Sequence, residues 1–401
     1  MAENKDKKVL NVPNLRFPEF EGEWEEHGLS EFLDFKNGLN PKPEKFGKGI
    51  KFISVMDILN NTIITYDSIK ACVDANNKEI DNYSVKMGDL LFQRSSETLE
   101  DVGRANVYMD EKPAIFGGFV IRGKKKGEYN PLFFKNLLET PFSRRKIIPM
   151  GAGAQHFNIG QEGLSKVKLY FAPINEQNKI AKILSLLDDR ISTQNKIIDK
   201  LQSLIKGISN RLLYADNSMS IRIEEMLIER SERTKKNNQY EILSSTVNGI
   251  FSQRDYFSKD IASDNNVGYK IVHLHDIVLS PQNLWMGNIN FNDKFDIGIV
   301  SPSYKVFSIA DGFDKKYVAA LLKTHHALYN YMLVSEQGAS TVRRNLNYEA
   351  FEQLVFKIPS LNKQQEIGHV ISLLKSQLEN ANLLIKTYNS QKQYLLRQMF
   401  I

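Results

Sequence analysis

Hydrophobic positions recur with alternating steps of four and three residues in two long stretches, residues 175–214 and 362–401. This spacing has a period of about 3.5, which keeps an apolar stripe on one face only where two helices supercoil around each other. Two ordinary amphipathic helices on a core are the alternative, but about five heptads is long for a surface helix. The predicted seam consists of Ile180, Leu184, Leu187, Ile191, Ile198, Leu201, Ile205, Ile367, Ile371, Leu374, Leu378 and Ile385.

Three positions interrupt this stripe: Gln194 in the first stretch, and Ala381 and Lys392 in the second. Such seam residues can set the register of a coiled coil at a cost in stability. Asn175 and Asn362 are expected to cap the starts of the two helices, because asparagine is a favoured N-cap residue.

The second stretch repeats the first without gaps at an offset of 187 residues, which carries Asn175 onto Asn362. The same offset relates GDLL at 88–91 to HDIV at 275–278, and GAGAQHFN at 151–158 to GASTVRRN at 338–345. The repeat therefore covers whole half-molecules, whose ends match and whose middles diverge.

Along the chain, a first module is followed by a helix, a second module and a second helix. This order determines the expected geometry. To share a seam with the first helix, the second must run back, so the pair is predicted to be antiparallel, with a pseudo-two-fold axis between the halves. The predicted fold class is α+β, with two globular mixed α/β domains joined by two long antiparallel coiled-coil helices. The predicted boundaries are 1–172, 173–214, 215–358 and 359–401.

Shorter periodicities predict the elements of the first module. Helical spacing is expected over Trp24–Phe35 and Pro131–Glu139. Alternating or continuous apolar runs, separated by Gly and Asn, predict short strands. These strands are expected at Lys51–Asp57, Thr62–Tyr66, Asp89–Gln93, Arg104–Met109, Ala114–Arg122 and Val167–Ala172.

Composition narrows the class of protein. The chain has 42% hydrophobic and 25% charged residues and a net charge of +6, which suits a polyanionic partner without requiring one. A single cysteine, Cys72, excludes an internal disulfide. Neither a signal peptide nor a run of about 18 apolar residues is present. We therefore expect a cytoplasmic protein without membrane contact.

Motifs for catalysis are absent or incomplete. Residues 130–133, Asn-Pro-Leu-Phe, lack the second proline of the Asn-Pro-Pro-Tyr/Phe motif of amino-methyltransferases. Residues 151–153, Gly-Ala-Gly, lack the lysine of a phosphate-binding loop and the third glycine of a dinucleotide fingerprint. The histidines at 273, 275, 325 and 326 have no Cys or carboxylate at ligand spacing. Asp188 and Asp189 are expected on a solvated helix face. The sequence indicates recognition, with no catalytic residue and no metal site.

Polar and basic residues in the loops are the remaining candidates, and double-stranded DNA is the expected ligand. Arginine pairs bidentately with guanine, asparagine or glutamine pairs with adenine, and lysine mainly contacts phosphate. A single surface arginine or lysine usually serves only solubility. The prediction therefore rests on the recurrence of such residues in corresponding loops. The predicted DNA-binding residues are Arg94, Ser95, Ser96, Arg104, Lys124, Lys125, Arg144, Gln155, His156, Gln282, Asn283, Arg343, Arg344 and Asn345.

This arrangement resembles the DNA-specificity subunit of type I restriction–modification systems over essentially the entire chain. The matching features are Pro173 to Gln177 and Pro359 to Gln364, each leading into Ile-x-x-x-Leu/Ile-Ser-Leu-Leu, the GDLL strand, the two Gly-Ala loops and the C-terminal LLRQMFI. Each motif is loose, but their twofold repetition at one offset is specific. The chain departs from the pattern at His275, which takes the place of Gly88, and at Tyr388 and Lys392. At these last two positions we expect a partner helix to complete the second seam.

The resemblance implies two target-recognition domains that each read half of a bipartite DNA site, with the helices setting the gap. It also implies two methyltransferase subunits that bind S-adenosylmethionine, and two ATP-driven, Mg-dependent restriction/translocase subunits. This chain would hold none of these cofactors, and it would act near the nucleoid of a bacterial or archaeal cell. Two alternatives remain: a coiled-coil protein-interaction scaffold without a DNA role, and a degenerate DNA methyltransferase.

Overall fold

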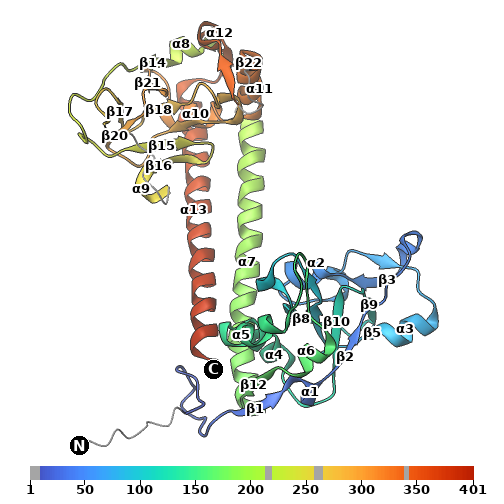
Figure 1. Ribbon diagram of the computed structural model, residues 1–401. Coiled ribbons are helices and arrows are strands. Elements are labelled where there is room, and N and C mark those ends of the chain that lie inside the picture. Colours follow the sequence, from blue (N-terminus) through green and yellow to red (C-terminus); the bar gives the residue numbers. More distant parts are fainter. Residues whose placement is uncertain (1–9, 213–218, 257–264, 338–342) are drawn as a thin grey trace, which may run out of the picture. The chain divides into compact units, whose positions relative to one another are not determined.

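The computed structural model describes residues 10–212, 219–256, 265–337 and 343–401, without the side chains of 209–212 (Figure 1). The chain forms two compact units. Unit 1 comprises Met1–Asn195 and Leu384–Ile401, and unit 2 comprises Lys196–Leu383. Each unit therefore combines a mixed module with parts of two long helices, α7 (Ile174–Leu212) and α13 (Leu361–Gln398).

A four-stranded antiparallel sheet, here called the scaffold sheet, organises unit 1 in the order β2-β10-β6-β8. Its strands are β2 (Leu33–Asn37), β6 (Leu90–Gln93), β8 (Ala105–Val107) and β10 (Val120–Lys125). A second sheet has the order β4-β3-β9-β5. Its strands are β3 (Phe46–Ile53), β4 (Cys72–Val73), β5 (Ser84–Val85) and β9 (Ala114–Phe116). Two strand pairs complete the unit: β1 (Glu25–Gly28) with β12 (Lys168–Phe171), and β7 (Ser95–Ser96) with β11 (Phe157–Asn158).

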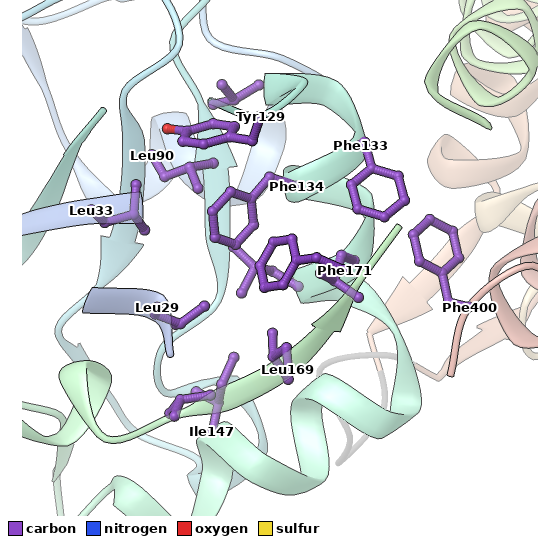
Figure 2. Close-up of a cluster of buried hydrophobic side chains, with 14 of the residues drawn as sticks. Leu29, Leu33, Leu90, Tyr129, Phe133, Phe134, Ile147, Leu169, Phe171 and Phe400 are labelled. Atoms are coloured by element: carbon purple, nitrogen blue, oxygen red, sulfur yellow. The ribbon is translucent and has the colours of Figure 1, made fainter. Parts of the chain in front are cut away.

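Short helices pack on the two sheets of unit 1 and close their cores. They are α1 (Leu29–Phe32), α2 (Val55–Asn60), α3 (Asn77–Tyr83), α4 (Pro131–Glu139), α5 (Pro141–Ile147) and α6 (Gln161–Ser165). Aromatic rings dominate the core, and Figure 2 shows Phe133 and Phe134 of α4 beside Phe171 of β12. Phe400, at the end of the chain, stacks on Phe133 with ring centroids 5.2 Å apart. The C-terminus is therefore part of the core of unit 1.

Unit 2 repeats the scaffold sheet in the same strand order, β14-β21-β18-β19. These strands are β14 (Leu227–Glu229), β18 (Ile277–Leu279), β19 (Ile289–Phe291) and β21 (Lys305–Ile309). The helices are α8 (Ile223–Met226), α9 (Gln253–Tyr256), α10 (Lys315–Leu321), α11 (His325–Leu333) and α12 (Tyr348–Glu352). Four further pairs are β13 (Met219–Arg222) with β24 (Val355–Ile358), β15 (Leu243–Thr246) with β16 (Gly249–Ser252), β17 (Lys270–His273) with β20 (Ile297–Val300), and β22 (Ser335–Gln337) with β23 (Arg344–Leu346).

The long helices run antiparallel within each unit. In unit 1, Lys392 Nζ near the end of α13 lies 2.6 Å from Asp188 Oδ1 in the first half of α7. In unit 2, Ile208 near the end of α7 packs against the core cluster that includes Ile367 and Ile371 of α13. The α+β fold class and the internal repeat are thereby confirmed.

All predicted seam positions are buried or half-buried, and so are the interruptions Gln194 and Ala381. The expectation that Asp188 faces solvent was wrong, because its side chain is only 16% exposed and pairs with Lys392. The charge that weakened the predicted second seam therefore has its partner within the same chain.

Four predicted elements of unit 1 differ from the structure. The strand expected at Lys51–Asp57 ends at Ile53, and helix α2 begins at Val55. Residues 24–35 form a strand, one helical turn and another strand, because pairing of β1 with β12 overrides the helical spacing. The run 114–122 is divided by a turn at 117–119 into β9 and β10, which belong to different sheets. Residues 62–66 form only an isolated bridge at Ile64. Pairing with segments that are distant in the sequence decided the structure at 24–35, 62–66 and 114–122.

Each predicted helix cap was two residues late. Helix α7 begins at Ile174 and α13 at Leu361, so Asn175 and Asn362 lie inside the first turn. The prolines that precede these helices already interrupt the strands before them, and the helices begin as soon as the backbone allows.

Buried glutamines, at 177 and 364, hold the starts of the long helices. Gln177 Nε2 donates to the Ala172 carbonyl at 2.8 Å, and its Oε1 accepts from the Asn130 amide at 2.9 Å. Asn130 is itself the N-cap of α4, so the glutamine ties the start of one helix to the start of another. Gln364 makes the corresponding bonds to the Pro359 carbonyl and the Asp314 amide.

The strands β6 and β18 enter the scaffold sheets through the same tight turn. The carboxylate of buried Asp89 accepts from the amide of Lys86 at 2.9 Å, and that of buried Asp276 accepts from the amide of His273 at 2.8 Å. In both pairs the aspartate side chain accepts from the amide three residues before it, and this hydrogen bond closes the turn. The repeated aspartate of GDLL and HDIV is thus a structural residue.

The residue before this aspartate has a positive φ in both units. Gly88 has φ 88°, where glycine carries no steric cost, and His275 has φ 74°. A histidine in the left-handed region costs about 1 kcal/mol or more. The ring of His275 stacks on Phe291, with centroids 5.6 Å apart.

Candidate nucleic-acid interface

Two loops that are far apart in sequence meet at one end of the scaffold sheet of unit 1. The chain leaves β6 at Arg94 and forms β7, which pairs with β11 at the end of the Gly-Ala loop. The Ile159 amide also donates to the Arg94 carbonyl at 2.9 Å. Residues 94–96 and 152–158 therefore form one continuous edge.

The side chains on this edge are polar and partly free. Arg94 is half-buried, and its Nη1 donates to the Gly118 carbonyl at 3.2 Å. Ser95 Oγ hydrogen-bonds to Asn158 Oδ1, while Gln155 and His156 are exposed. The structure thus joins the loop that carries Arg94, Ser95 and Ser96 to the loop that carries Gln155 and His156.

Phe119 belongs to the same edge and was not predicted from the sequence. Its carbonyl accepts from the Arg94 amide at 2.9 Å, and its side chain is 68% exposed. From the sequence alone, an aromatic residue at the start of a strand is expected to lie in the hydrophobic core. Only the turn at 117–119 between the two sheets directs it to the surface.

Unit 2 joins its corresponding loops in a similar way. The Arg344 amide donates to the Gln282 carbonyl at 3.1 Å, which connects the loop after β18 to strand β23. Gln282, Arg343 and Asn345 are exposed, whereas Asn283 is half-buried. The predicted residues of unit 2 are therefore neighbours, although residues 338–342 of the Gly-Ala loop lie outside the described residues.

Arg344 is held more firmly than its neighbours. Its Nη2 donates to the Ser335 carbonyl at 2.8 Å, and its guanidinium lies 5.8 Å from the ring centroid of Trp285. Arginine over an indole face gains a cation–π interaction. Arg344 is thus positioned by the loop, while Arg343 and Asn345 face outward.

Arg104 and Arg144 have structural partners. The Arg104 side chain forms an ion pair with Asp101 at 2.7 Å. Arg144 Nη2 donates to the carbonyls of Glu100 and Val102 at 2.8 and 2.6 Å, and burial lowers the pKa of Arg144 to about 10. Both residues also line a pocket of about 330 Å³ against the end of α13. Arg144 thus links α5 to the loop before β8.

Lys124 and Lys125 lie at the opposite end of the scaffold sheet from Arg94. They end strand β10, whose first residue Val120 pairs with Gln93, beside Arg94. Lys125 Nζ donates to the Tyr129 carbonyl at 3.1 Å and lies 4.7 Å from the centroid of that ring. These lysines do not share an edge with the loop cluster.

A second surface of the chain is apolar and repeated. On α7, Ile183, Leu186 and Ile197 are exposed, one step beside the buried seam. The residues 187 positions later on α13, Val370, Leu373 and Leu384, are exposed as well. Exposed leucines and isoleucines at matching helical positions are typical of a binding face, because scattered surface residues would not repeat.

Within the described parts of the chain, no group of three or more His, Cys, Asp or Glu side chains could hold a metal ion. The same residues contain no helix long and apolar enough to span a membrane. The loop edges offer hydrogen-bond donors and acceptors suited to base edges and phosphates.

Residues 21–203 match the family described as the type I restriction modification DNA specificity domain. Two curated relatives come from Methanocaldococcus jannaschii. The MjaX type I restriction enzyme specificity subunit is 27% identical over 210 residues, which cover 51% of this chain and 49% of that protein. The MjaVIII specificity subunit is 25% identical over 214 residues, covering 52% and 45%. The matches span about half the length of these relatives.

Two solved structures share the fold over nearly the whole chain. The S subunit of a type I restriction–modification system from M. genitalium has a TM-score of 0.63 and 14% identity, covering 97% of this chain and 99% of that one. A chain from a structure of type I R-M complex assembly and conformational transition has a TM-score of 0.51 and 12% identity, covering 94% and 97%. The matched family is a DNA specificity domain and not a catalytic one. Residues 21–203 are thus similar to the DNA specificity domain of type I restriction–modification systems, and the chain has the fold of a solved S subunit of such a system.

Proposed function

We propose that this chain is the sequence-reading subunit of a type I restriction–modification complex. Residues 1–172 and 215–358 act as target-recognition domains, each reading half of a bipartite double-stranded DNA site. Residues 173–214 and 359–401 act as spacer helices. Methyltransferase and restriction subunits dock on the chain and supply S-adenosylmethionine, ATP and Mg chemistry.

One observation carries this proposal: the same loop pair is built twice on the same sheet order with different side chains. In unit 1 the edge presents Arg94, Gln155 and His156, and in unit 2 it presents Gln282 and Arg343. Two domains that recognise different half-sites need similar loops that carry different polar side chains. Bidentate pairs from such groups are worth about 1–3 kcal/mol of discrimination each.

The repeated apolar stripes support docking of two copies of one partner. Ile183 and Leu186 lie in unit 1, and Val370 and Leu373 lie in unit 2. Since the two stripes match position for position, a single kind of partner surface fits both. The methyltransferase subunit is the partner we assign to them.

The test is exchange of residues 20–170 for the corresponding module of another specificity subunit. Methylation profiling of DNA from cells that carry the hybrid and its methyltransferase should show one changed half-site and one unchanged half-site. As a finer variant, Gln155→Ala with His156→Ala should relax only the half-site read by unit 1, and Gln282→Ala should relax only the other. A change in both half-sites from either exchange would contradict modular reading.

A further inference from the structure

A pocket of about 530 Å³ lies at the start of α13, within unit 2. Its wall comes from the turn before β18, the first turn of α10 and one face of α13. The face of α13 contributes Leu361, Gln365 and His369, spaced one helical turn apart, and His369 adjoins Val370 of the exposed apolar stripe. The pocket therefore continues the surface to which we assign the methyltransferase subunit.

One wall of this pocket is formed by His275, whose backbone has φ 74°. Its exposed ring stacks on Phe291, another pocket residue, with centroids 5.6 Å apart. The corresponding residue of unit 1 is Gly88, which occupies the same backbone region without strain. A strained side chain at the surface, where glycine would serve the fold better, points to binding.

The charge of the pocket is basic. Lys315 and Lys316 are exposed in the first turn of α10, next to His275 and His369. The pocket carboxylate, Asp314, accepts from the Tyr317 amide at 2.8 Å as the N-cap of α10. Cations in the first turn oppose the helix dipole, so their position is unfavourable for the helix itself.

The pocket at the start of α7 in unit 1 has the opposite charge. Glu23, Glu25 and Glu128 line it, together with His27. The two pockets share corresponding positions, because Ile174 and Leu361 line them at the 187-residue offset. The two halves of the chain therefore present unlike charge at the start of matching helices.

From this difference we propose that the unit 2 pocket anchors an acidic, aromatic-containing segment of the methyltransferase subunit. The inference rests on the proposed docking of two copies of that subunit. An acidic segment is attracted by Lys315 and Lys316 and is repelled by Glu23 and Glu25. The two copies then bind in order, first at unit 2 and second at unit 1.

The experiment is a titration of the purified methyltransferase subunit into the full chain without DNA, followed by native mass spectrometry and sedimentation velocity. At about 50 mM NaCl the first copy should bind about tenfold or more tightly than the second, and about 300 mM NaCl should narrow this gap by screening. The double variant Lys315→Glu, Lys316→Glu should remove the gap. Its acidic residues suit a first helical turn, so α10 is kept.

The matched control is Lys235→Glu with Lys236→Glu, two exposed neighbouring lysines of unit 2 outside the pocket. This control should keep the tighter first step. Equal loss in both double variants, or two equal steps in the unmodified chain, would overturn the anchor while leaving docking intact. No binding of the methyltransferase subunit at all would instead overturn the proposed function.

His275→Gly separates a structural role from a binding role. Relief of the positive φ should raise the melting temperature, and loss of the stacked ring should weaken the first binding step by about threefold or more. A more stable variant with unchanged binding would show that the histidine does not belong to the anchor.

Discussion

Units 1 and 2 share their scaffold and differ in what the scaffold carries. The strand orders β2-β10-β6-β8 and β14-β21-β18-β19 are equivalent, and the turns at Asp89 and Asp276 are built alike. Between these common strands, unit 1 inserts the sheet β4-β3-β9-β5, whereas unit 2 has the pairs β15-β16 and β17-β20. The difference teaches that backbone hydrogen bonds fix the frame of each unit, while the inserted segments are free to diverge.

The starts of the long helices differ in how they are held. In unit 1 the segment before β1 packs onto α7: Arg16 Nε and Nη2 each lie 2.8 Å from the carboxylate oxygens of Glu176, which is fully buried. Trp24 Nε1 donates to the same carboxylate at 3.2 Å. The position corresponding to Glu176 in α13 is Lys363, which is exposed and pairs with Glu366.

The largest expected effect comes from removing the buried contact that distinguishes the start of α7 from the start of α13. Arg16→Ala removes a bidentate partner and leaves the Glu176 carboxylate buried with less compensation, so unit 1 should lose about 3 kcal/mol. Lys363→Ala, the control at the corresponding exposed position, should cost less than about 0.5 kcal/mol. The chain has two tryptophans, Trp24 in unit 1 and Trp285 in unit 2, so urea unfolding can be followed for each unit by fluorescence. Similar losses in both variants would refute the distinct anchoring of α7.

A second difference concerns pH. Burial, followed by the nearby Lys375, lowers the pKa of Lys323 in unit 2 to about 8. Its ammonium donates to Asn290 Oδ1 at 2.6 Å. The folded chain holds this proton less tightly than the unfolded chain, so stability should rise as pH increases from about 8 to about 10.5. Among the described residues, the lysines with a lowered pKa, Lys270, Lys323 and Lys375, all lie in unit 2.

The expected gain for unit 2 across this pH window is on the order of 2 kcal/mol. Urea unfolding followed by Trp285 fluorescence in a Trp24→Phe background measures it. Lys323→Met should flatten the pH dependence, and a steep rise that persists in this variant would exclude Lys323 as its source.

The glutamines test the similarity of the two units. Gln177→Ala and Gln364→Ala each remove two hydrogen bonds and leave buried backbone groups unpaired, so each should cost about 2 kcal/mol in its own unit. Hydrogen exchange of the first turns of α7 and α13 measures the loss locally. Costs that differ by more than about 1 kcal/mol would show that the two helix starts are not equivalent.

The smallest expected effects concern the turn residue. Gly88→Ala should destabilise unit 1 by about 1 kcal/mol, because φ is 88° and a Cβ would lie 3.3 Å from the side chains of Lys125 and Pro131. His275→Gly should stabilise unit 2 by a similar amount, about 1 kcal/mol. Thermal unfolding of both variants checks the opposite signs, and equal signs would deny that the turns are equivalent.

Local signals were sufficient for the regular elements. Helix Pro131–Glu139 has its predicted bounds because Asn130 caps it and Pro131 suits its first position. The half-buried and buried seam of α7 and α13 follows from spacing alone. The helix predicted over 24–35 was wrong, because the apolar spacing there suits a helix but residues 25–28 pair with β12 as a strand.

The candidate interface was predictable only in part. Gln155 and His156 were predicted because their loop recurs at the repeat offset, and the structure joins that loop to Arg94 and the strand after it. Phe119 was missed, and Arg144 is bound to the carbonyls of Glu100 and Val102. Side-chain type indicates which residues could contact a base, but not which of them already have partners in the fold.

By itself, the sequence determined the repeat, the two long helices and the absence of a recognisable catalytic motif, because helical period and repeat offset are properties of residue order. Tertiary structure alone decided that Lys392 pairs with Asp188 and that Gln177 and Gln364, not the neighbouring asparagines, hold the helix starts. It also decided the unlike charges of the two helix-start pockets. Such features depend on which distant segments meet, and hydrophobic spacing does not encode that.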